Sequence, residues 1–257
     1  MQTTFEFVVL ENDGAVARIL LRRPPLNVLN LEMIRELNRA LRDVRPESGL
    51  RALVLAAEGK AFSAGVSVED HLPDNAGDML GAFHETFRQL RTLCCPTIAA
   101  VQGAALGGGC ELACFADWVI ASESATFGLP EIKLGAFPPI AAVHFPHRIG
   151  LARTLQLILS GDTLPAREAE RIGLVDRVVP AADLPAALEE AVQRLREKSG
   201  PALRLAKRAV LLGSGRDFDA ALADVERLFL EKLMKTRDAE EGLRAFLEKR
   251  APQWTHH

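Results

Sequence analysis

Short apolar runs alternate with helical stretches through residues 1–182 of the chain. Phe5–Leu10 and Val16–Leu21 have the composition of strands, and the turn-forming residues Asn12-Asp13-Gly14 separate them. Further runs of the same kind follow at 53–55, 97–101, 118–120 and 174–179. Because each run is short, apolar and bounded by other structure, each is predicted to be a buried strand.

Two stretches between these strands have the spacing of amphipathic helices. Leu31–Val44 is one of them, with Asn30 placed to cap its N-terminus. Asp78–Leu93 is the other, because its large apolar residues recur every three to four positions. The resulting alternation, β–β–α–β–α–β, predicts an α/β fold with a largely parallel sheet wrapped by helices.

From residue 183 the pattern becomes helical. One apolar stripe runs from Leu184 to Leu195, and Gly200-Pro201 is predicted to end that helix. A second stripe follows at 222–233, with more apolar positions at 243 and 246. We therefore divide the chain into a core, residues 1–182, and a helical C-terminal region, residues 183–257. The pattern allows this region to pack on its own core or against a neighbouring subunit.

Composition narrows the classes of function. The chain has 257 residues and 48% of them are hydrophobic, which argues against a disordered protein. Its 31 Lys and Arg stand against 34 Asp and Glu, so it lacks the basic excess of a dedicated nucleic-acid binder. It has no Tyr and 6 His. Carboxylates or backbone groups are therefore the expected carriers of any catalysis.

The four cysteines are interpreted as buried thiols. Cys94 and Cys95 are adjacent, and Cys110 and Cys114 are one helical turn apart with no histidine at metal-ligand spacing. This usage, with an N-terminus that lacks the features of a signal peptide, predicts a cytoplasmic protein without a metal. Leu93–Cys110 is uncharged and approaches the length of a membrane span. Its proline and glycines favour a buried strand and a glycine-rich turn instead, so no membrane association is predicted.

Two glycine-rich turns are the first candidates for chemistry. Gly59–Ser67 follows the strand at 53–56, and Gly103–Leu112 follows the strand at 97–101. Both would lie at the carboxyl ends of parallel strands, where ligands tend to bind. The second turn also opens a predicted helix, Gly109–Phe115, whose first N–H groups have no intrahelical partner. Two such donors converging on one carbonyl oxygen would form an oxyanion hole; glycines that only permit close helix–sheet packing are the alternative.

Two isolated carboxylates favour a catalytic site over glycines that serve only packing. Glu111 lies in residues 108–114, a stretch that is otherwise uncharged. Glu131 follows a short strand-like run near residue 127. Burial of an unpaired carboxyl raises its pKa, which suits it to proton transfer near neutral pH. Beside a possible oxyanion hole, the two residues predict proton transfer next to a carbonyl group.

Several segments together resemble the enoyl-CoA hydratase/isomerase family, also called the crotonase family. They are Ala61–Val66, Gly103–Leu112, Phe127–Gly135, Ile172–Asp176 and the run Arg23-Pro24 with Asn27. The resemblance covers nearly the whole chain. It implies a crotonase-like spiral of ββα units with a C-terminal helical region, and a homotrimer or a homohexamer.

The resemblance also implies a binding site for an acyl-CoA thioester. The backbone N–H groups of Val66 and Gly108 would hold the thioester carbonyl. Ser63 and Ala64, together with Leu26, would contact the CoA moiety. CoA is then part of the substrate, and no metal or redox cofactor is implied.

In hydratases of the family two glutamates hold and activate a water molecule. Glu111 and Glu131 occupy those positions with the family's spacing. Glu111 would act as base on the water and Glu131 would deliver a proton to carbon. Other branches often keep only one of the two, so hydration is the leading reaction that the resemblance implies.

Two segments depart from the usual hydratase pattern. Ala136–Pro146 replaces a glycine-rich turn, and Val66–Pro73 lacks the Asp that commonly follows the Ala-Gly-x triplet. These changes resemble the branch that hydrates cyclic dienoyl-CoA thioesters, the cyclohexa-1,5-diene-1-carbonyl-CoA hydratases of anaerobic aromatic degradation. His71, Pro139 and Ile140 would then lie near the acyl group, although a loop histidine such as His71 is often only solvated.

Three other functions remain open from the sequence. One is a double-bond isomerase or thioester hydrolase of the same family, and another is a non-catalytic acyl-CoA-binding member. The third is a serine hydrolase, because Ala61–Gly65 is one residue away from a nucleophile-elbow motif centred on Ser63. Loss of turnover in Ser63→Ala would favour the hydrolase, since an oxyanion loop built on backbone groups is expected to tolerate that change.

Overall fold

The computed structural model describes residues 1–44 and 49–256. A seven-stranded sheet has the spatial order β1-β2-β3-β4-β5-β7-β10, and a three-stranded sheet has the order β6-β8-β9. The first sheet consists of β1 Gln2–Thr4, β2 Val8–Asn12, β3 Val16–Leu21, β4 Ala52–Ala57, β5 Thr97–Val101, β7 Trp118–Ser122 and β10 Arg177–Val179. The second consists of β6 Ala104–Leu106, β8 Thr126–Gly128 and β9 Thr163–Pro165.

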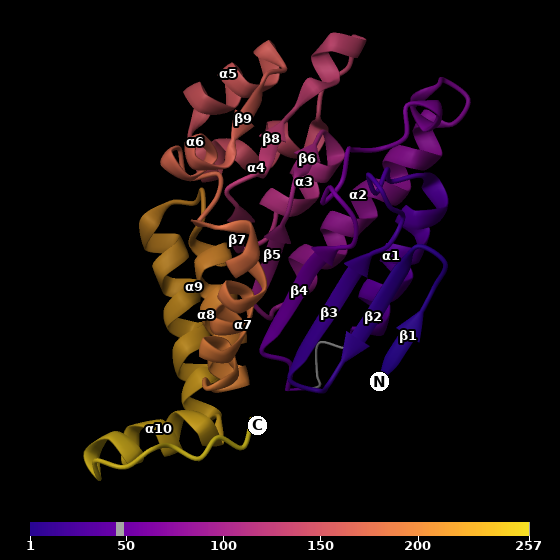
Figure 1. Cartoon of the computed structure of the whole chain (residues 1–257). Coiled ribbons are helices and arrows are strands. Elements are labelled where there is room, and N and C mark those ends of the chain that lie inside the picture. Colours follow the sequence, from indigo (N-terminus) through magenta and orange to yellow (C-terminus); the bar gives the residue numbers. More distant parts are fainter. Residues whose placement is uncertain (45–48, 257) are drawn as a thin grey trace.

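Helices surround both sheets. The α-helices are α1 Leu31–Asp43, α2 Ala76–Thr92, α3 Gly108–Cys114, α4 Pro139–Ile149, α5 Leu151–Ser160, α6 Ala166–Arg171, α7 Leu184–Arg196, α8 Gly200–Gly213, α9 Phe218–Glu231 and α10 Arg237–Leu247. Short 3₁₀ helices are η1 Glu69–His71, η2 Pro130–Leu134, η3 Ala181–Asp183 and η4 Leu233–Lys235. Figure 1 shows α3 and the smaller sheet beyond one end of the large sheet, and α10 at the opposite end of the molecule.

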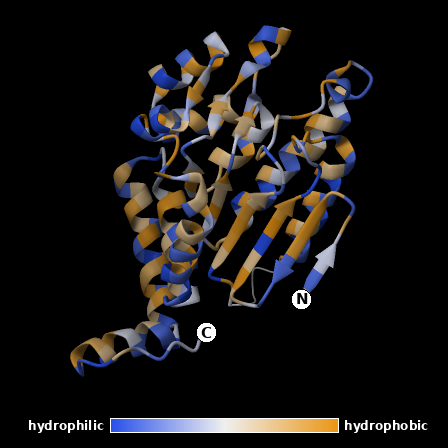
Figure 2. Cartoon of the chain, in the orientation of Figure 1, coloured by the Kyte–Doolittle hydropathy of each residue, from blue (hydrophilic) through white to orange (hydrophobic). Residues whose placement is uncertain are grey.

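The large sheet is mostly parallel, as the sequence predicts. Strands β3, β4, β5, β7 and β10 pair in parallel, while β1, β2 and β3 form an antiparallel edge. Alternate residues of one strand enter two separate cores: Leu53 and Leu55 of β4 pack with α1 and α2, whereas Ala52 and Val54 pack with α7. Because side chains alternate across a strand, the sheet is buried on both faces. The apolar colouring of β2, β3 and β4 in Figure 2 reflects this burial.

The helix α1 begins where the sequence predicts. The side chain of Asn30 accepts a hydrogen bond from the backbone N–H of Met33 at 3.1 Å, which is the cap expected at a helix N-terminus. Helices α2 and α3 are displaced by at most two residues from the predicted Asp78–Leu93 and Gly109–Phe115. Such offsets are normal at helix ends, which fray.

Two predicted strands have different bounds in the structure. The strand predicted at 5–10 is observed at Val8–Asn12, because the N–H of Phe7 donates to the Glu36 carboxylate instead of to a neighbouring strand. The strand predicted at 174–179 shortens to Arg177–Val179, because the N–H groups of Leu174 and Val175 return to the carbonyl of Ala169. In both places a local hydrogen bond outcompetes strand pairing.

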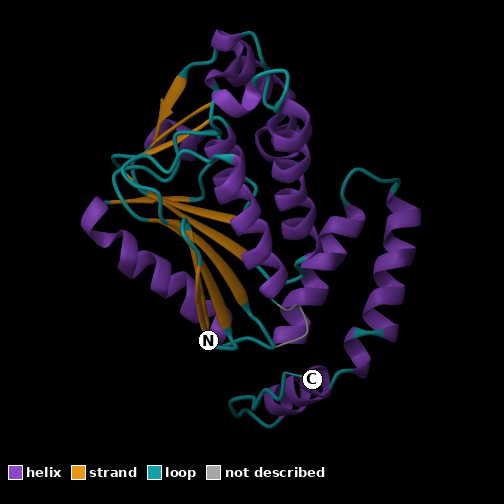
Figure 3. Cartoon of the chain, turned by 90° about the vertical axis from the view of Figure 1, so that its right-hand side faces the viewer, coloured by secondary structure: helices purple, strands orange, loops and turns teal. Residues whose placement is uncertain are grey.

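The C-terminal region is helical, but Gly200-Pro201 has a different role from the predicted one. The helix α7 ends at Arg196, and Gly200-Pro201 opens α8. Proline is well tolerated there, because the first turn of a helix needs no donor from it. Side chains of α7 belong to the core of the large sheet, so this helix packs on its own chain. Figure 3 shows α10 with the C-terminal segment away from the smaller sheet.

Among the described residues, no helix combines the length and the apolar character that crossing a bilayer requires. The segment 93–110 instead contains β5, β6 and the start of α3. The interpretation of this segment as a buried strand followed by a glycine-rich turn is therefore confirmed, with one short strand added.

Candidate active site

The two glycine-rich turns meet directly. Ser63 pairs in parallel with Ala105 of β6: its N–H donates to the Ala104 carbonyl at 3.1 Å, and its carbonyl accepts from the Leu106 N–H at 2.9 Å. A Cβ on Gly65 would lie 3.0 Å from the Leu106 carbonyl oxygen, so only glycine permits this approach. The two turns are therefore in direct contact at the carboxyl ends of β4 and β5.

Val66 and Gly108 lie against each other at this junction. A Cβ added at Gly108 would come within 2.7 Å of Val66 Cγ2. Gly108 is the first residue of α3, so its N–H has no intrahelical acceptor. Among the hydrogen bonds that the described residues form outside helices and strands, none uses the N–H of Val66 or of Gly108. Two residues whose backbone N–H groups have no protein acceptor are therefore in contact, as an oxyanion hole built from these two donors requires.

Glu111 lies one turn along α3 from Gly108. The residue is 2% exposed, and its Oε1 accepts a hydrogen bond of 2.8 Å from the N–H of Ala141, near the N-terminus of α4. Burial raises the pKa of Glu111 to about 8, the Ala141 N–H opposes that shift, and the charge of Glu131 adds to it. A carboxyl with this pKa can give or take a proton near neutral pH.

Glu131 approaches the same turn from η2. Its Oε1 lies 2.7 Å from the position a Cβ would take on Gly107, so any side chain at that position would meet the carboxylate. Its Oε2 is buried and has no hydrogen-bond partner among the described residues. Burial raises the pKa of Glu131, while its own backbone N–H and the charge of His71 oppose the rise. Glu111 and Glu131 thus converge on the first turn of α3, where a small polar ligand would satisfy the unpaired oxygen.

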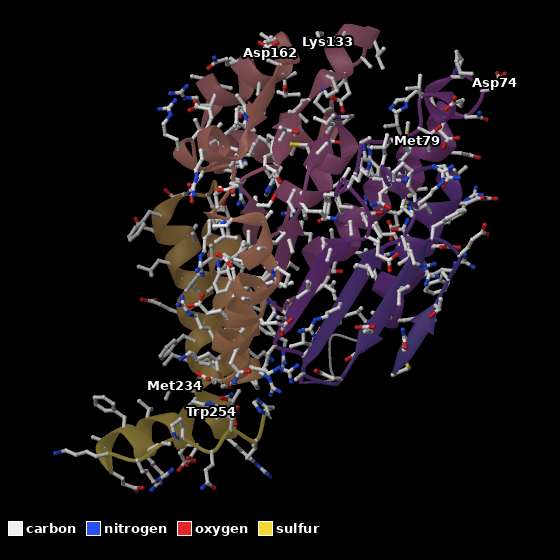
Figure 4. The ribbon with its side chains drawn as sticks, in the orientation of Figure 1. Asp74, Met79, Lys133, Asp162, Met234 and Trp254 are labelled. Atoms are coloured by element: carbon white, nitrogen blue, oxygen red, sulfur yellow. The ribbon has the colours of Figure 1, made fainter. Side chains whose placement is uncertain are left out.

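The residues predicted near the acyl group surround these carboxyls. Pro139 is the first residue of α4, followed by Ile140 and by Ala141, whose N–H donates to Glu111. His71 is exposed, its Nδ1 lies 2.8 Å from the Ser67 carbonyl oxygen, and its charge acts on Glu131. In Figure 4, Asp74 lies in the loop before α2 and Lys133 lies in η2, at the same end of the molecule.

The residues predicted to contact CoA divide into two groups. The N–H of Ala64 donates to the carbonyl of Leu26 at 2.8 Å, and Leu26 is 47% exposed. These two neighbours remain available to a ligand. Ser63 is 0% exposed: its Oγ donates to the Asn27 carbonyl at 2.8 Å and accepts from the Gly65 N–H at 3.1 Å. Its side chain is in no position to touch CoA, and none of its hydrogen bonds involves a histidine, which disfavours a serine hydrolase.

Asn27 is a residue whose importance the sequence did not reveal. It is 0% exposed and has a φ of 49°, in the left-handed region that Asn tolerates better than most residues. Its Nδ2 donates to the carbonyls of Glu58 and Ala61, and its Oδ1 accepts from the Arg23 N–H. Asn27 therefore ties the segment that carries Leu26 to the end of β4. The sequence marked Asn27 as one of the positions that resemble the family, but it did not indicate these hydrogen bonds.

Stability offers a test of the Glu111 environment that does not depend on activity. The pKa of Glu111 is raised from 4.5 to about 8 in the folded chain, so between these values the folded state binds more protons than the unfolded state. Stability from this group is therefore lost as pH rises through that window, by at most about 1.4 kcal/mol per pH unit. Glu111→Gln removes this dependence. Urea unfolding at pH 5 and pH 8 should show the variant gaining on the wild type; parallel changes in both proteins would contradict the assignment.

Comparison with known proteins agrees with this geometry. A family model described as enoyl-CoA hydratase/isomerase matches residues 11–257. A probable enoyl-CoA hydratase of Mycobacterium bovis is 40% identical, covering 98% of this chain and 99% of its own. A cyclohexa-1,5-dienecarbonyl-CoA hydratase of Thauera aromatica is 41% identical, covering 96% and 95%. The crystal structure of an enoyl-CoA hydratase from Bacillus anthracis superposes with a TM-score of 0.91 at 32% identity, covering 98% and 100%. The fold that the resemblance implied is confirmed.

Proposed function

The chain belongs to the enoyl-CoA hydratase/isomerase family, and on that premise we propose that it adds water to a conjugated enoyl-CoA thioester. The observation that carries this proposal is the convergence of two carboxyls, Glu111 and Glu131, on a helix N-terminus with two unused backbone donors. The relatives named as hydratases support the reaction class. They do not favour the isomerase, thioester hydrolase or serine hydrolase alternatives.

In the proposed mechanism the thioester carbonyl oxygen accepts hydrogen bonds from Val66 and Gly108. Conjugation withdraws electron density from the β carbon, so attack of water there places negative charge on that oxygen. Donors already in position stabilise this charge without reorganisation, and losing one of them costs roughly 3–4 kcal/mol of transition-state stabilisation. In this mechanism backbone N–H groups, and not polar side chains, stabilise the negative charge on the carbonyl oxygen.

The two glutamates would carry the proton transfers. Ionised Glu111 takes a proton from the water as its oxygen bonds to the β carbon, and protonated Glu131 gives a proton to the α carbon. Each turnover leaves Glu111 protonated and Glu131 ionised, so the pair holds one proton before and after the reaction. A water touching both carboxyls would pass the proton between them and reset the pair after each turnover.

This pairing predicts a bell-shaped pH dependence. When both carboxyls are protonated the base is lost, and when both are ionised the acid is lost. Burial raises both pKa values, that of Glu111 to about 8. We expect kcat/KM to be highest between these limits and to fall on both sides. The measurement is initial hydration rate against pH with a soluble enoyl-CoA. A rate that keeps rising above pH 9 would contradict the shared-proton arrangement.

We further propose a cyclic dienoyl-CoA thioester as the preferred substrate. Support comes from the 41% identity to the Thauera aromatica protein and from α4, which begins at Pro139 and whose Ala141 N–H donates to the Glu111 carboxyl. Side-by-side assays with cyclohexa-1,5-diene-1-carbonyl-CoA and crotonyl-CoA test this choice. Faster turnover of the cyclic thioester supports it; crotonyl-CoA hydrated far faster would leave a hydratase with a different substrate.

The proposal extends to the oligomeric state, the cellular compartment and the absence of a cofactor. The exposed apolar side chains of α8–α10, among them Phe246 at 82% exposure, support assembly into a homotrimer or homohexamer. The four cysteines are free thiols, three of them buried, which suits a reducing cytoplasm. The reaction as proposed takes no cofactor, because CoA arrives as part of the substrate.

A further inference from the structure

Ser63 is a buried polar residue to which the proposed chemistry assigns no part. Its hydroxyl lies between two backbone groups of different segments, the Asn27 carbonyl at 2.8 Å and the Gly65 N–H at 3.1 Å. The side chain is 0% exposed. A hydroxyl in such a position satisfies one acceptor and one donor that would otherwise be buried without partners.

The same residue also determines how closely the two turns approach. Its backbone N–H and carbonyl pair with β6, which leads directly into Gly107 and Gly108. A Cβ on Gly109 would lie 2.5 Å from the Ser63 carbonyl oxygen and 2.8 Å from its Oγ. Ser63 is therefore packed against the first turn of α3, while its hydroxyl holds the Ala64–Gly65 peptide, one residue before the N–H of Val66.

The two proposed oxyanion donors, Val66 and Gly108, are thus connected through one residue. On one side Ser63 Oγ fixes the Gly65 N–H and with it the orientation of the peptide chain entering Val66. On the other side the Ser63 backbone fixes the end of β6 and the start of α3. Asn27 connects this arrangement to the end of β4. Its backbone carbonyl accepts a hydrogen bond from the Ser63 hydroxyl, and its side chain donates to two carbonyls just after β4.

We infer that Ser63 is a positioning residue that sets the separation and direction of the Val66 and Gly108 N–H groups. It does not touch the substrate; it acts through the Gly65 peptide. This inference rests on the proposed function, because it assumes that the two N–H groups receive a thioester carbonyl. It differs from the expectation that Ser63→Ala is tolerated, since that change leaves the Gly65 N–H without its acceptor.

The expected effect is on chemistry rather than on CoA affinity. A misplacement on the scale of 1 Å can cost about 100-fold in rate, so Ser63→Ala is expected to lower kcat by roughly 10- to 100-fold. The affinity for free CoA should stay at the wild-type value, because the Ser63 side chain is out of reach of the ligand. Ser63→Cys keeps a similar volume with a weaker hydrogen-bonding group, and we expect it to fall between Ser63→Ala and the wild type.

The decisive readout is the infrared carbonyl stretch of bound butyryl-CoA labelled with ¹³C at the thioester carbon, a saturated ligand with no double bond to hydrate. In the wild type, hydrogen bonds from both donors should lower this frequency relative to free thioester; in Ser63→Ala the lowering should shrink along with kcat. Ser122→Ala is the matched control, because Ser122 is equally buried and, among the side chains that the structure describes, its hydroxyl bonds only to Ser124. It should keep the wild-type frequency and kcat.

Each outcome has one meaning. A wild-type frequency in Ser63→Ala, with or without a lower kcat, would overturn the positioning role. If Ser63→Ala does not fold, Ser63→Cys is read by the same criterion. If the wild type itself shows no lowering of the frequency, the proposed oxyanion hole fails instead, which is a different result from failure of the role of Ser63.

Discussion

Replacing Glu111 or Glu131 with Gln is expected to lower kcat for enoyl-CoA hydration by about 10²- to 10⁴-fold, the range typical of losing a positioned acid or base. Gln keeps the shape of the side chain, and at position 111 its carbonyl oxygen can still accept from Ala141. The loss should therefore come from proton transfer and not from a collapsed site. The measurement is steady-state hydration by each purified variant, with KM reported separately.

A matched control comes from a buried glutamate outside the site. Glu36 is 6% exposed and accepts hydrogen bonds from the N–H groups of Glu6 and Phe7. Glu36→Gln should leave kcat at the wild-type value. Activity retained in Glu111→Gln or Glu131→Gln would remove that residue from the proposed mechanism, and equal losses in Glu36→Gln would show that the assay reports on folding.

Gly108→Ala is expected to lower kcat by about 10²- to 10³-fold, the range found when one oxyanion donor is lost. The new Cβ would lie 2.7 Å from Val66 Cγ2 and 2.9 Å from Phe83 Cζ, so these two side chains must shift, and we expect the Val66 N–H to be displaced with its side chain. The proposed donors then no longer meet at one oxygen. Hydration rate and the Kd of free CoA are the two quantities to compare, with the loss expected in rate.

Gly81→Ala is the control for this change. Gly81 lies within α2, and a Cβ added there has open space within 4 Å. In a helix interior Ala is favoured over Gly by up to about 1 kcal/mol, so this variant should be active and slightly more stable. A fully active Gly108→Ala enzyme would mean that the carbonyl is bound elsewhere.

The sequence predicts the elements that strong local signals define. The cap at Asn30, the alternation of buried strands and the helical character after residue 183 all appear in the structure. The smaller sheet was not predicted as a sheet. Its strands β6, β8 and β9 are three residues each, too short for an alternating pattern to be recognised. They exist because the rest of the fold brings them together.

Residues of the candidate site also differ in how far the sequence alone could predict them. Glu111 and Glu131 were identified because single acids in apolar stretches are conspicuous, and the structure places both at one turn. The hydrogen bonds of Asn27 and Ser63 were not predicted, because their side chains donate to carbonyls that lie 31 to 36 residues away in the chain. A small buried polar residue carries no local sign of which backbone groups it will satisfy.

Hydration in H₂¹⁸O is the most direct test of whether this protein adds water to a conjugated enoyl-CoA. With purified protein and a conjugated enoyl-CoA, the account predicts loss of the conjugated thioester together with a product that contains one ¹⁸O atom as a hydroxyl group and still carries its CoA. Mass spectrometry of the product distinguishes the alternatives in one experiment. A labelled carboxylate with release of free CoA would show a thioester hydrolase, and an unlabelled product with a shifted double bond would show an isomerase. Either result would contradict the proposed hydratase.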